Sequence, residues 1–300
     1  MSQHAGRDPT EVWTIQRLLV WTADWLGRSG SATPRIDAES LLGHVLGKSR
    51  LHLLLSFDQP VQANELAAFK QLIRRRARHE PVAYIVGRRG FHDIDVAVTP
   101  AVLVPRPETE TLVDFAAAYL QDASAVDGPV LDLCTGSGCV ALALIRDMEK
   151  TGKIRQVWAS DVSEAALDVA RANAVDQARP MYVVHGDLYA MLPAGLRFAA
   201  IVSNPPYVTT ADWQKLDADV RDFEPRLALD GGPDGLDVVR RIVAGAPDWL
   251  HAGGLCALEV GSRAQAVAAC SMAEAVGFAH VRPTQVVGSK THVVTCVLGR

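Results

Sequence analysis

The sequence predicts an α/β protein with a mostly parallel sheet and helices on both faces of that sheet. After Pro105, short apolar runs typical of strands alternate with longer segments in which apolar residues recur at helical spacing. Such alternation is typical of a sheet whose strands are joined by crossover helices. Before Glu80 the periodicity is helical throughout, which predicts a separate small helical domain.

Length and composition agree with this organisation. The chain has 300 residues, 49% of them hydrophobic, which is enough for one large α/β domain and a smaller one. Its net charge is −4, whereas proteins that hold nucleic acid through phosphates usually carry a basic excess, so we expect no stable nucleic-acid partner. We find no signal pattern and no apolar run of membrane-spanning length, and we expect a cytoplasmic monomer without membrane contact.

The cysteine and histidine residues show no spacing typical of disulfide bonds or of a metal site. The five cysteines are odd in number and lack paired spacing, and the nine histidines are scattered, so we expect neither disulfides nor a metal. One dense cluster of charge, Arg74–Arg78, ends a predicted helix, where cations interact favourably with the helix dipole. A docking patch for an acidic partner or for ribosomal RNA is the alternative interpretation of this cluster.

Three regions follow from the patterns. Residues 1–81 are expected to form a helical domain that docks a substrate, with one helix through Ile15–Leu26, an apolar series at Leu41–Leu46 and a later helix beginning near Ala63. Residues 82–104 contain short extended runs and predict a β-hairpin linker. Residues 105–300 form the α/β domain.

The α/β domain is expected to place its functional residues at the carboxyl ends of parallel strands, where ligands of such sheets bind. The predicted elements are a strand at Val130–Leu133, a helix from Gly138, a strand at Val157–Ser160, a helix from Glu164, strands at Tyr182–Val184 and Ala199–Ser203, a helix from about Leu236, a strand at Leu255–Val260, a helix from about Ala264, and closing strands around Phe278–Val287 and His292–Leu298.

The loop after the first of these strands is a candidate cofactor site. In VLDLCTGSG, Gly136 and Gly138 allow the backbone to approach a ligand, and the helix that follows presents free N–H groups. The loop is not the G-x-G-x-x-G of a dinucleotide fold and lacks a Walker lysine, and a tight turn without a ligand remains an alternative. Asp161 ends the next strand and is placed to accept both hydroxyls of a ribose. Asp187 and Leu188 follow the third strand, where a carboxylate can bind an adenine amino group.

The segment after the fourth strand carries the chemistry. In Asn204-Pro-Pro-Tyr207, two prolines fix φ and remove two N–H donors, which leaves the carbonyls of Asn204 and Pro205 as acceptors. Tyr207 adds a flat apolar face. Two acceptors and an aromatic surface form a site for a planar –NH₂ group, and a proline-stiffened turn without a ligand is the alternative.

This arrangement addresses the low reactivity of an amide nitrogen, whose lone pair is delocalised into the carbonyl. Holding both N–H bonds favours pyramidalisation and directs the lone pair at a sulfonium methyl group. Positioning of this kind can lower a barrier by roughly 7–11 kcal/mol. No strong base is needed for attack, because the proton leaves after the new bond forms.

These motifs resemble the HemK/PrmC family of protein-(glutamine-N5) methyltransferases, which act on the GGQ loop of class I peptide chain release factors. The resemblance covers nearly the whole chain and includes PRPETE at 105–110, the glycine loop, Asp161, NPPY at 204–207 and EPRLALDGGPDGL at 224–236. It implies a class I Rossmann-like methyltransferase domain with a seven-stranded sheet and a reversed last strand.

The resemblance also implies the ligands and the residues that contact them. S-adenosyl-L-methionine is the implied cofactor and S-adenosyl-L-homocysteine the product. The implied cofactor-binding residues are Cys134, Thr135, Gly136, Ser137, Gly138, Asp161, Asp187, Leu188 and Asn204. The implied substrate-binding residues are Asn204, Pro205, Pro206, Tyr207, Arg106 and Glu108, of which Asn204, Pro205 and Tyr207 are the candidate catalytic residues.

One departure from the family pattern keeps an alternative open. The loop reads DLCTGSG, whereas release-factor enzymes more often have DLGTGSG. The cysteine form resembles PrmB-like sister enzymes, which modify a glutamine of a large-subunit ribosomal protein but usually lack PRPETE. NPPY is also shared with adenine-amino methyltransferases of nucleic acids. We favour the release factor as the substrate.

Overall fold

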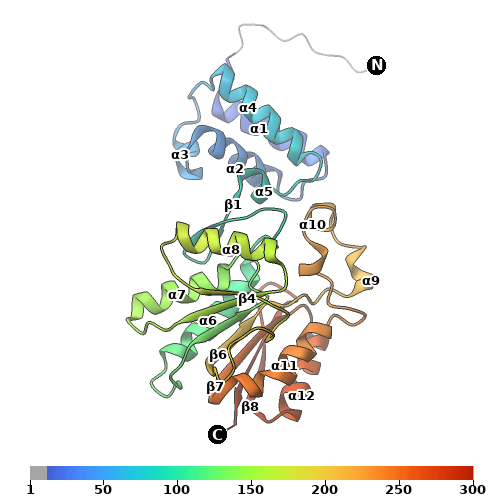
Figure 1. Cartoon of the computed structure of the whole chain (residues 1–300). Coiled ribbons are helices and arrows are strands. Elements are labelled where there is room, and N and C mark those ends of the chain that lie inside the picture. The colour runs from blue at the N-terminus through green and yellow to red at the C-terminus, as the bar shows by residue number, and fades with distance from the viewer. Residues whose placement is uncertain (1–11, 300) are drawn as a thin grey trace. The chain divides into compact units, whose positions relative to one another are not determined.

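The structure, a computed structural model, describes residues 12–299. The chain divides into two compact units after Gly87 (Figure 1). Among the described residues, no helix is both long and apolar enough to cross a bilayer.

The first unit is helical, and its helices match the predicted periodicity. Ile15, Leu19, Leu41 and Phe69 are fully buried in its core. The unit contains α1 (Ile15–Arg28), α2 (Pro34–Leu46), α3 (Arg50–Leu55), α4 (Ala63–Arg76) and α5 (Val82–Val86). The three helices predicted from apolar spacing are therefore confirmed.

The arginine cluster at the end of α4 is partly structural. Arg76 is buried and donates from Nε to Asp37 Oδ2 at 2.6 Å, which ties the end of α4 to the start of α2. Asp37 also accepts from the hydroxyls of Ser31 and Thr33 at 2.7 and 2.9 Å. A buried ion pair with this many hydrogen bonds fixes the helix–helix register.

The prediction of extended structure from residue 82 onward is wrong for its first five residues, Val82–Val86, which form α5. The run VAYIV is rich in β-branched residues, but Pro81 precedes it and Gly87 ends it in the left-handed conformation at φ 79°. Because Ala83, Tyr84 and Ile85 are buried, packing overrides the local preference.

The predicted hairpin is present but is not a free linker. Strands β1 (Arg88–Phe91) and β2 (Ile94–Ala97) pair in antiparallel fashion and belong to the second unit. Asn173 on α8 donates to and accepts from the backbone of Ala97 and also donates to Ser137 O at 2.9 Å. One buried amide thus attaches the hairpin to the glycine loop.

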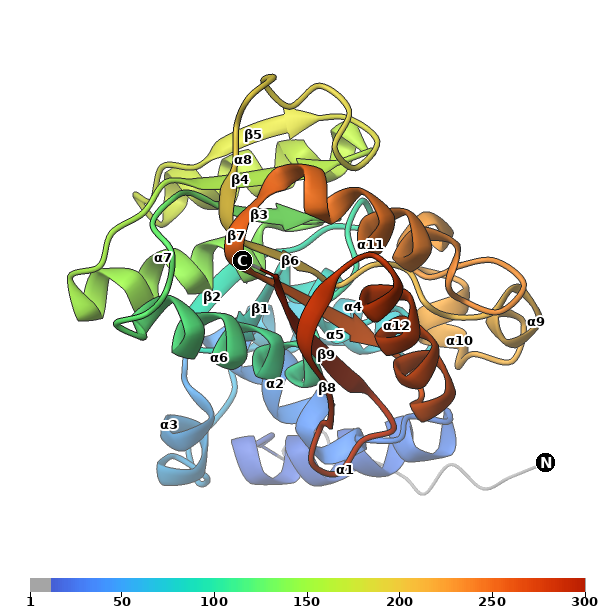
Figure 2. The ribbon, with the colours of Figure 1, turned by 90° about the horizontal axis from the view of Figure 1, so that it is seen from below.

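The second unit also contains a seven-stranded sheet in the order β5-β4-β3-β6-β7-β9-β8, with helices on both faces (Figure 2). Its strands are β3 (Val130–Leu133), β4 (Val157–Asp161), β5 (Tyr182–His185), β6 (Phe198–Ser203), β7 (Leu250–Val260), β8 (Phe278–Gln285) and β9 (His292–Leu298). The first five are parallel, and β9 runs antiparallel to both β7 and β8, so the expected reversed last strand is confirmed.

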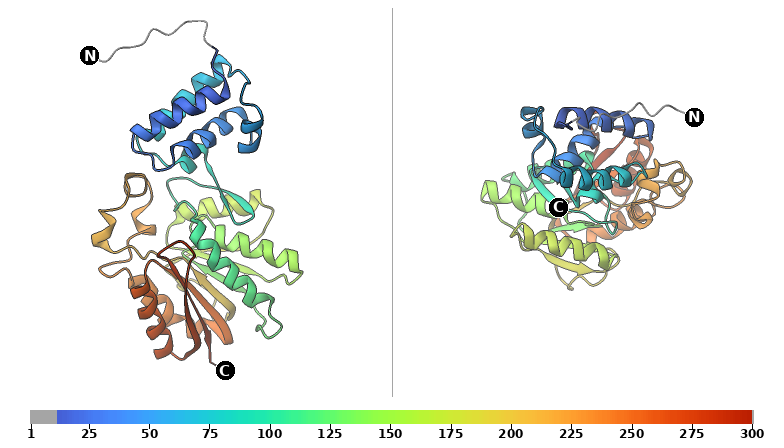
Figure 3. Two further views of the ribbon diagram at one scale, coloured as in Figure 1. Left: turned by 180° about the vertical axis from the view of Figure 1, so that it is seen from behind. Right: turned by 90° about the horizontal axis from the view of Figure 1, so that it is seen from above.

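Two groups of helices cover the sheet. Helices α6, α7 and α8 lie on one face, and α11 and α12 lie on the other (Figure 3). The helices of this unit are α6 (Pro107–Gln121), α7 (Cys139–Thr151), α8 (Glu164–Asp176), α9 (Thr210–Trp213), α10 (Ala218–Arg221), the 3₁₀ turn η1 (Arg226–Ala228), α11 (Asp237–Trp249) and α12 (Arg263–Ala275). The predicted elements are present, although β7 begins at Leu250 instead of Leu255.

Strand register brings the candidate motifs together. Leu133, the last residue of β3, pairs with Ser160 on one side and with Ser203 on the other. Strands β3 and β6 are buried along their whole length, as expected for central parallel strands. The loops that follow β3, β4 and β6 therefore leave the sheet side by side.

Candidate active site

A cavity of about 310 Å³ lies at the carboxyl ends of these strands. It is within the size range of small-ligand sites. Ten of the predicted site residues line it, namely Arg106, Cys134, Thr135, Gly136, Ser137, Asp161, Asp187, Leu188, Asn204 and Pro206. Glu108, Gly138, Pro205 and Tyr207 are not among its lining residues.

The glycine loop has a left-handed backbone at three positions, with φ of 58° at Cys134, 55° at Gly136 and 79° at Gly138. A Cβ added to Gly136 would meet no atom within 4 Å, so this glycine leaves open space at the cavity wall. Gly138 has a different role. Its N–H donates to Thr135 O, and an added Cβ would lie 3.3 Å from Ala170 Cβ, so Gly138 closes the turn against α8.

Asp161 presents a carboxylate to the cavity from the end of β4. Its oxygens accept from the backbone N–H groups of Gly136 and Ser163, both at 2.9 Å. Burial raises the pKa of Asp161, and these backbone donors oppose that shift. The carboxylate is thus fixed in position, and each oxygen keeps lone pairs for a ligand hydroxyl.

The turn after β5 forms another part of the wall. Leu188 is buried at φ 55°, and its carbonyl accepts from Ser160 Oγ at 3.0 Å. Asp187 pairs with Arg241 of α11 at 2.8 Å, with about half of each side chain exposed. Arg241, which the sequence did not single out, lines the same cavity.

The reactive loop is held by contacts on three sides. Asn204 donates from Nδ2 to Thr109 Oγ1 at 3.0 Å, and Tyr207 donates from its hydroxyl to Glu259 Oε1 at 3.0 Å. Tyr207 O accepts from Gln265 Nε2 at 2.8 Å. Among the described residues, no backbone hydrogen bond ends on the carbonyl of Asn204 or of Pro205, so both acceptors remain available.

The two specific family segments meet beside this loop. Arg106 forms an ion pair with the buried carboxyl of Glu224 at 2.5 Å, and Glu224 also accepts from Val104 N at 3.0 Å. The residues after Glu224, among them Pro225 and Leu227, line the cavity. Arg106 therefore anchors one cavity wall as well as facing the site.

Two buried acids near the site were not predicted from the sequence. Asp132, within β3, accepts from Thr135 Oγ1 at 2.6 Å and from Ala141 N at 3.2 Å. Glu259, near the end of β7, has no exposed surface. Burial raises the pKa of each carboxyl to about 7. A charged residue inside an apolar strand run was the available signal for both.

Comparison with known proteins identifies the family. The family model described as "PrmC N-terminal domain" matches residues 17–87, and "Methyltransferase small domain" matches residues 109–220. The release factor glutamine methyltransferase of Geobacter sulfurreducens is 42% identical, over 84% of this chain and 85% of the relative. The enzyme of the same name from Burkholderia pseudomallei is 44% identical, over 82% and 86%. The chain belongs to the release factor glutamine methyltransferase family.

Solved structures agree on the fold of this family member. The 16S rRNA N2 G1207 methyltransferase of T. thermophilus, in complex with AdoMet and guanosine, matches with a TM-score of 0.52. That structure is 18% identical and covers 70% of this chain, while the match covers 49% of its own length. The similarity shows a class I methyltransferase fold, and the chain is an S-adenosylmethionine-dependent methyltransferase.

Family membership and geometry together account for the unusual Cys134. Its left-handed φ of 58° is a conformation in which glycine carries no steric penalty. A non-glycine residue in this region costs about 1–3 kcal/mol. Burial raises the pKa of the Cys134 thiol to about 12, so the thiol is neutral. The cysteine is therefore a tolerated substitution in a release factor glutamine methyltransferase, and the sister-enzyme alternative is not favoured.

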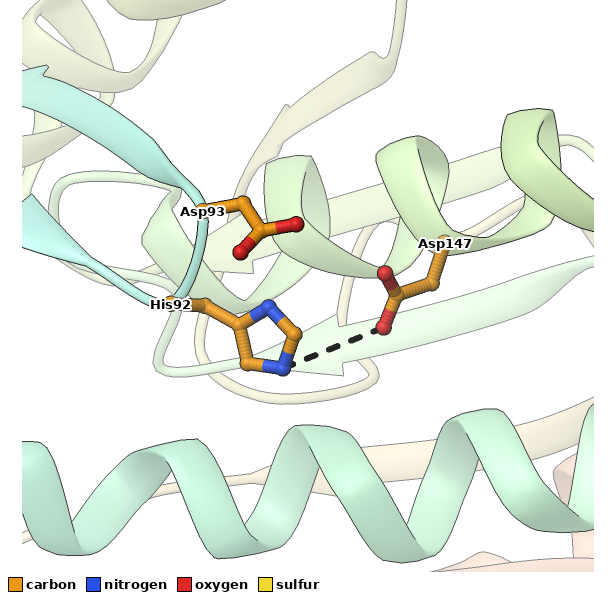
Figure 4. A group of neighbouring side chains, drawn as sticks. All are labelled: His92, Asp93 and Asp147. Atoms are coloured by element: carbon orange, nitrogen blue, oxygen red, sulfur yellow. Dashed lines mark ion pairs between the residues drawn. The ribbon is translucent and has the colours of Figure 1, made fainter.

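A second cluster of titratable groups lies away from the cavity. His92, Asp93 and Asp147 could offer three ligand atoms within 4.8 Å of one another (Figure 4). However, Asp93 is paired with Lys150 and lies 3.6 Å from Arg146, and Lys150 also contacts Asp147 at 3.0 Å. Cationic side chains already compensate both carboxylates, so the cluster forms an ion-pair network.

The pKa of Asp132 predicts how the stability of the unit depends on pH. The carboxyl binds its proton more tightly after folding, because its pKa rises from 3.8 to about 7. This contribution to stability is complete below the unfolded value and is lost as the pH rises through 7. Between pH 5 and pH 8 we expect the unfolding free energy of wild type to fall by about 3 kcal/mol relative to that of Asp132→Asn, measured by urea unfolding.

The exposed Asp168 on α8 provides the matched control, because Asp168→Asn removes a carboxyl from the surface. A difference between wild type and Asp132→Asn that stays constant from pH 5 to pH 8 would contradict the assignment.

Proposed function

We propose that this chain methylates the side-chain amide nitrogen of the glutamine in the GGQ motif of class I peptide chain release factors, with S-adenosylmethionine as the donor. The observation that carries the proposal is the Asn204–Tyr207 loop, which lies beside the cavity with two free carbonyl acceptors in a release factor glutamine methyltransferase. The reaction yields the N-methyl amide, S-adenosyl-L-homocysteine and one proton.

The cavity residues fit the cofactor. S-adenosylmethionine, when bound, supplies an electrophilic methyl group on its sulfonium sulfur. Asp161 would hold the ribose hydroxyls, since its carboxylate is fixed by two backbone donors. The turn at Asp187 and Leu188 would hold the adenine, and the backbone from Cys134 to Ser137 would border the amino acid part. The open space beside Gly136 supports this placement.

The reactive loop would hold the substrate amide. Acceptors at Asn204 and Pro205 bind its two N–H hydrogens and direct the nitrogen lone pair into the cavity. Pro206 supplies an apolar wall, because it lines the cavity. Tyr207 does not line the cavity. Its ring packs closely against Gly261, where an added Cβ would lie 2.7 Å from Tyr207 Cδ2, and its hydroxyl binds Glu259. Tyr207 therefore fixes the loop rather than forming the cavity surface.

Arg106 and Glu108 have different places in this proposal. Arg106 lines the cavity and is anchored by Glu224, so it supports the substrate wall. Glu108 lies in the first turn of α6, where it favours the helix dipole, and it does not line the cavity. We assign substrate contact to Arg106 and retain Glu108 as a helix-start residue.

The helical unit would dock the release factor. Leu51 and Leu55, one helical turn apart on α3, are 64% and 75% exposed. Such apolar surface favours contact with a protein. The expectations of a monomer, of a cytoplasmic location and of no stable nucleic-acid partner stay predictions.

The first experiment tests the substrate. Purified protein and methyl-labelled S-adenosylmethionine are offered separately a release factor, the same factor with its GGQ glutamine changed to alanine, a large ribosomal subunit and duplex DNA. We expect label on the unchanged release factor alone. Label on the ribosomal subunit alone would support the sister activity, and label on DNA alone would remove the protein substrate.

Two variants separate catalysis from cofactor binding. Asn204→Ala keeps the backbone carbonyl but removes the side-chain amide, which binds Thr109 and carries the further acceptor Oδ1. We therefore expect kcat to fall by about 100-fold or more while the Kd for S-adenosylmethionine changes little. Asp161→Asn should raise the Kd for S-adenosylmethionine by a larger factor than it lowers kcat. Calorimetry and initial rates measure both quantities, and near-normal kcat in Asn204→Ala would refute the role of the loop.

The docking role predicts a change in KM alone. Replacing Leu51 and Leu55 by serine should raise KM for the release factor by roughly tenfold, because two leucines lose apolar contact. Activity on a short GGQ peptide should be unchanged. Lys70→Ser on the exposed surface of α4 is the control. Equal loss on the factor and on the peptide would exclude docking through α3.

A further inference from the structure

Glu259 is a buried carboxyl group without an ionic partner at hydrogen-bond distance among the described residues. It lies near the end of β7, beside the loop that follows β6, and its exposed surface is 0%. Its Oε1 accepts from the Tyr207 hydroxyl at 3.0 Å, whereas Oε2 has no hydrogen-bond partner among the described residues. A buried acceptor of this kind costs free energy unless a donor reaches it.

The Thr109 hydroxyl, on the helix α6 that packs against β7, can supply that donor. Burial raises the pKa of the Glu259 carboxyl to about 7, and the neighbouring Thr109 hydroxyl opposes this shift. Thr109 Oγ1 already accepts from Asn204 Nδ2 at 3.0 Å, so its own hydrogen is free to point elsewhere. A hydroxyl hydrogen rotates to suit its neighbours, and above pH 7, where Glu259 is ionised, its unpartnered oxygen is the acceptor that attracts it.

We propose that Glu259 is a positioning residue that fixes the orientation of the Asn204 amide through Thr109. With its hydrogen donated to the carboxylate, Thr109 can only accept from Asn204. The nitrogen of Asn204 is then held against α6, and its oxygen Oδ1 is presented to the cavity. This inference rests on the proposed function, because it explains how the loop offers an acceptor to an –NH₂ group.

The opposite orientation would not support the reaction. If Thr109 donated to Asn204 Oδ1, the Asn204 amide would rotate and present Nδ2 to the cavity. The Asn204 side chain would then offer N–H groups to the N–H groups of the substrate amide, and only the backbone carbonyls could accept. A single hydroxyl hydrogen therefore decides whether the Asn204 side chain attracts or repels the substrate amide.

Glu259 acts through other residues and not on the substrate. Asn204 and Thr109 line the cavity, but Glu259 is not among its lining residues. It is thus separated from the reacting atoms by the side chains that it orients. The same carboxyl group also accepts from Tyr207, so one buried acid fixes both ends of the Asn204–Tyr207 segment.

Glu259→Gln tests the proposal with little change of volume. Glutamine has one acceptor oxygen and an NH₂ group, so it can bind the Tyr207 hydroxyl and donate to Thr109. Thr109 would then donate to Asn204 and reverse its amide. We expect kcat to fall by about 10- to 100-fold, while the Kd for S-adenosylmethionine stays within twofold of wild type.

Thr109 provides the matched pair of variants. Thr109→Ser keeps the hydroxyl and should keep most of the activity. Thr109→Val keeps the volume but removes the hydroxyl, and it should lose activity to the same degree as Glu259→Gln. Equal activity of the serine and valine variants would overturn the proposal.

A direct readout comes from the side-chain amide signals of asparagine. The chain has three asparagines, Asn64, Asn173 and Asn204, so selective ¹⁵N-asparagine labelling gives a simple NMR spectrum. Asn204→Ala assigns the relevant signal. Asn64 is exposed, and Asn173 is buried and donates to Ala97 O and Ser137 O, so they mark fast and slow solvent exchange.

In wild type, an Asn204 proton bonded to Thr109 should exchange slowly with solvent. In Glu259→Gln it should exchange faster and its chemical shift should move, while the Asn173 signals stay unchanged and show that the fold is intact. Unchanged Asn204 signals in Glu259→Gln would overturn the proposal, whatever the activity. The spectrum needs no protein substrate, so its outcome is independent of whether the release factor is methylated.

Discussion

The site depends on the register of three parallel strands. Because β3 pairs with β4 on one side and β6 on the other, Leu133, Ser160 and Ser203 end at one level. The glycine turn follows β3, Asp161 is the last residue of β4, and the Asn204–Tyr207 segment follows β6. None of these loops has the same neighbours if a strand shifts by one residue, because such a shift also turns every side chain to the other face.

Several buried carboxyl groups lie in or near the cavity wall, and they differ in how well their charge is compensated. Asp161 and Glu224 have strong partners, two backbone N–H groups in one case and Arg106 with a backbone N–H in the other. Within residues 12–299, Asp132 and Glu259 form no ion pair, and burial raises the pKa of both to about 7. Weakly compensated acids lower stability and persist where a site needs fixed acceptors.

Rigidity of the reactive loop comes from close packing as much as from its prolines. An added Cβ at Gly235 would lie 2.1 Å from Tyr207 O, and one at Gly231 would lie 2.5 Å from Pro206 O. The segment that contains both glycines pairs with Val208 through backbone hydrogen bonds. The conspicuous DGGPDG sequence is therefore the surface against which the loop rests, and a side chain at either glycine would displace the loop.

The sequence by itself determined the strands, the helices that follow them and the loops that carry chemistry, because periodicity, glycine and proline act on neighbouring residues. It also identified the family, through motifs that are contiguous in the chain. It was wrong at Val82–Val86, where a short run between proline and glycine is compatible with both helix and strand, and burial selected the helix.

Only the tertiary structure decided which residues support the site from behind. Thr109, Glu224 and Glu259 come from three separate segments, and each gains its role from a partner far away in sequence. Glu259 lies in an apolar run that resembles any buried strand, and its contact with Tyr207 exists because β7 pairs with β6. Long-range register of this kind is set by the packing of the whole sheet, and no local pattern in the sequence records it.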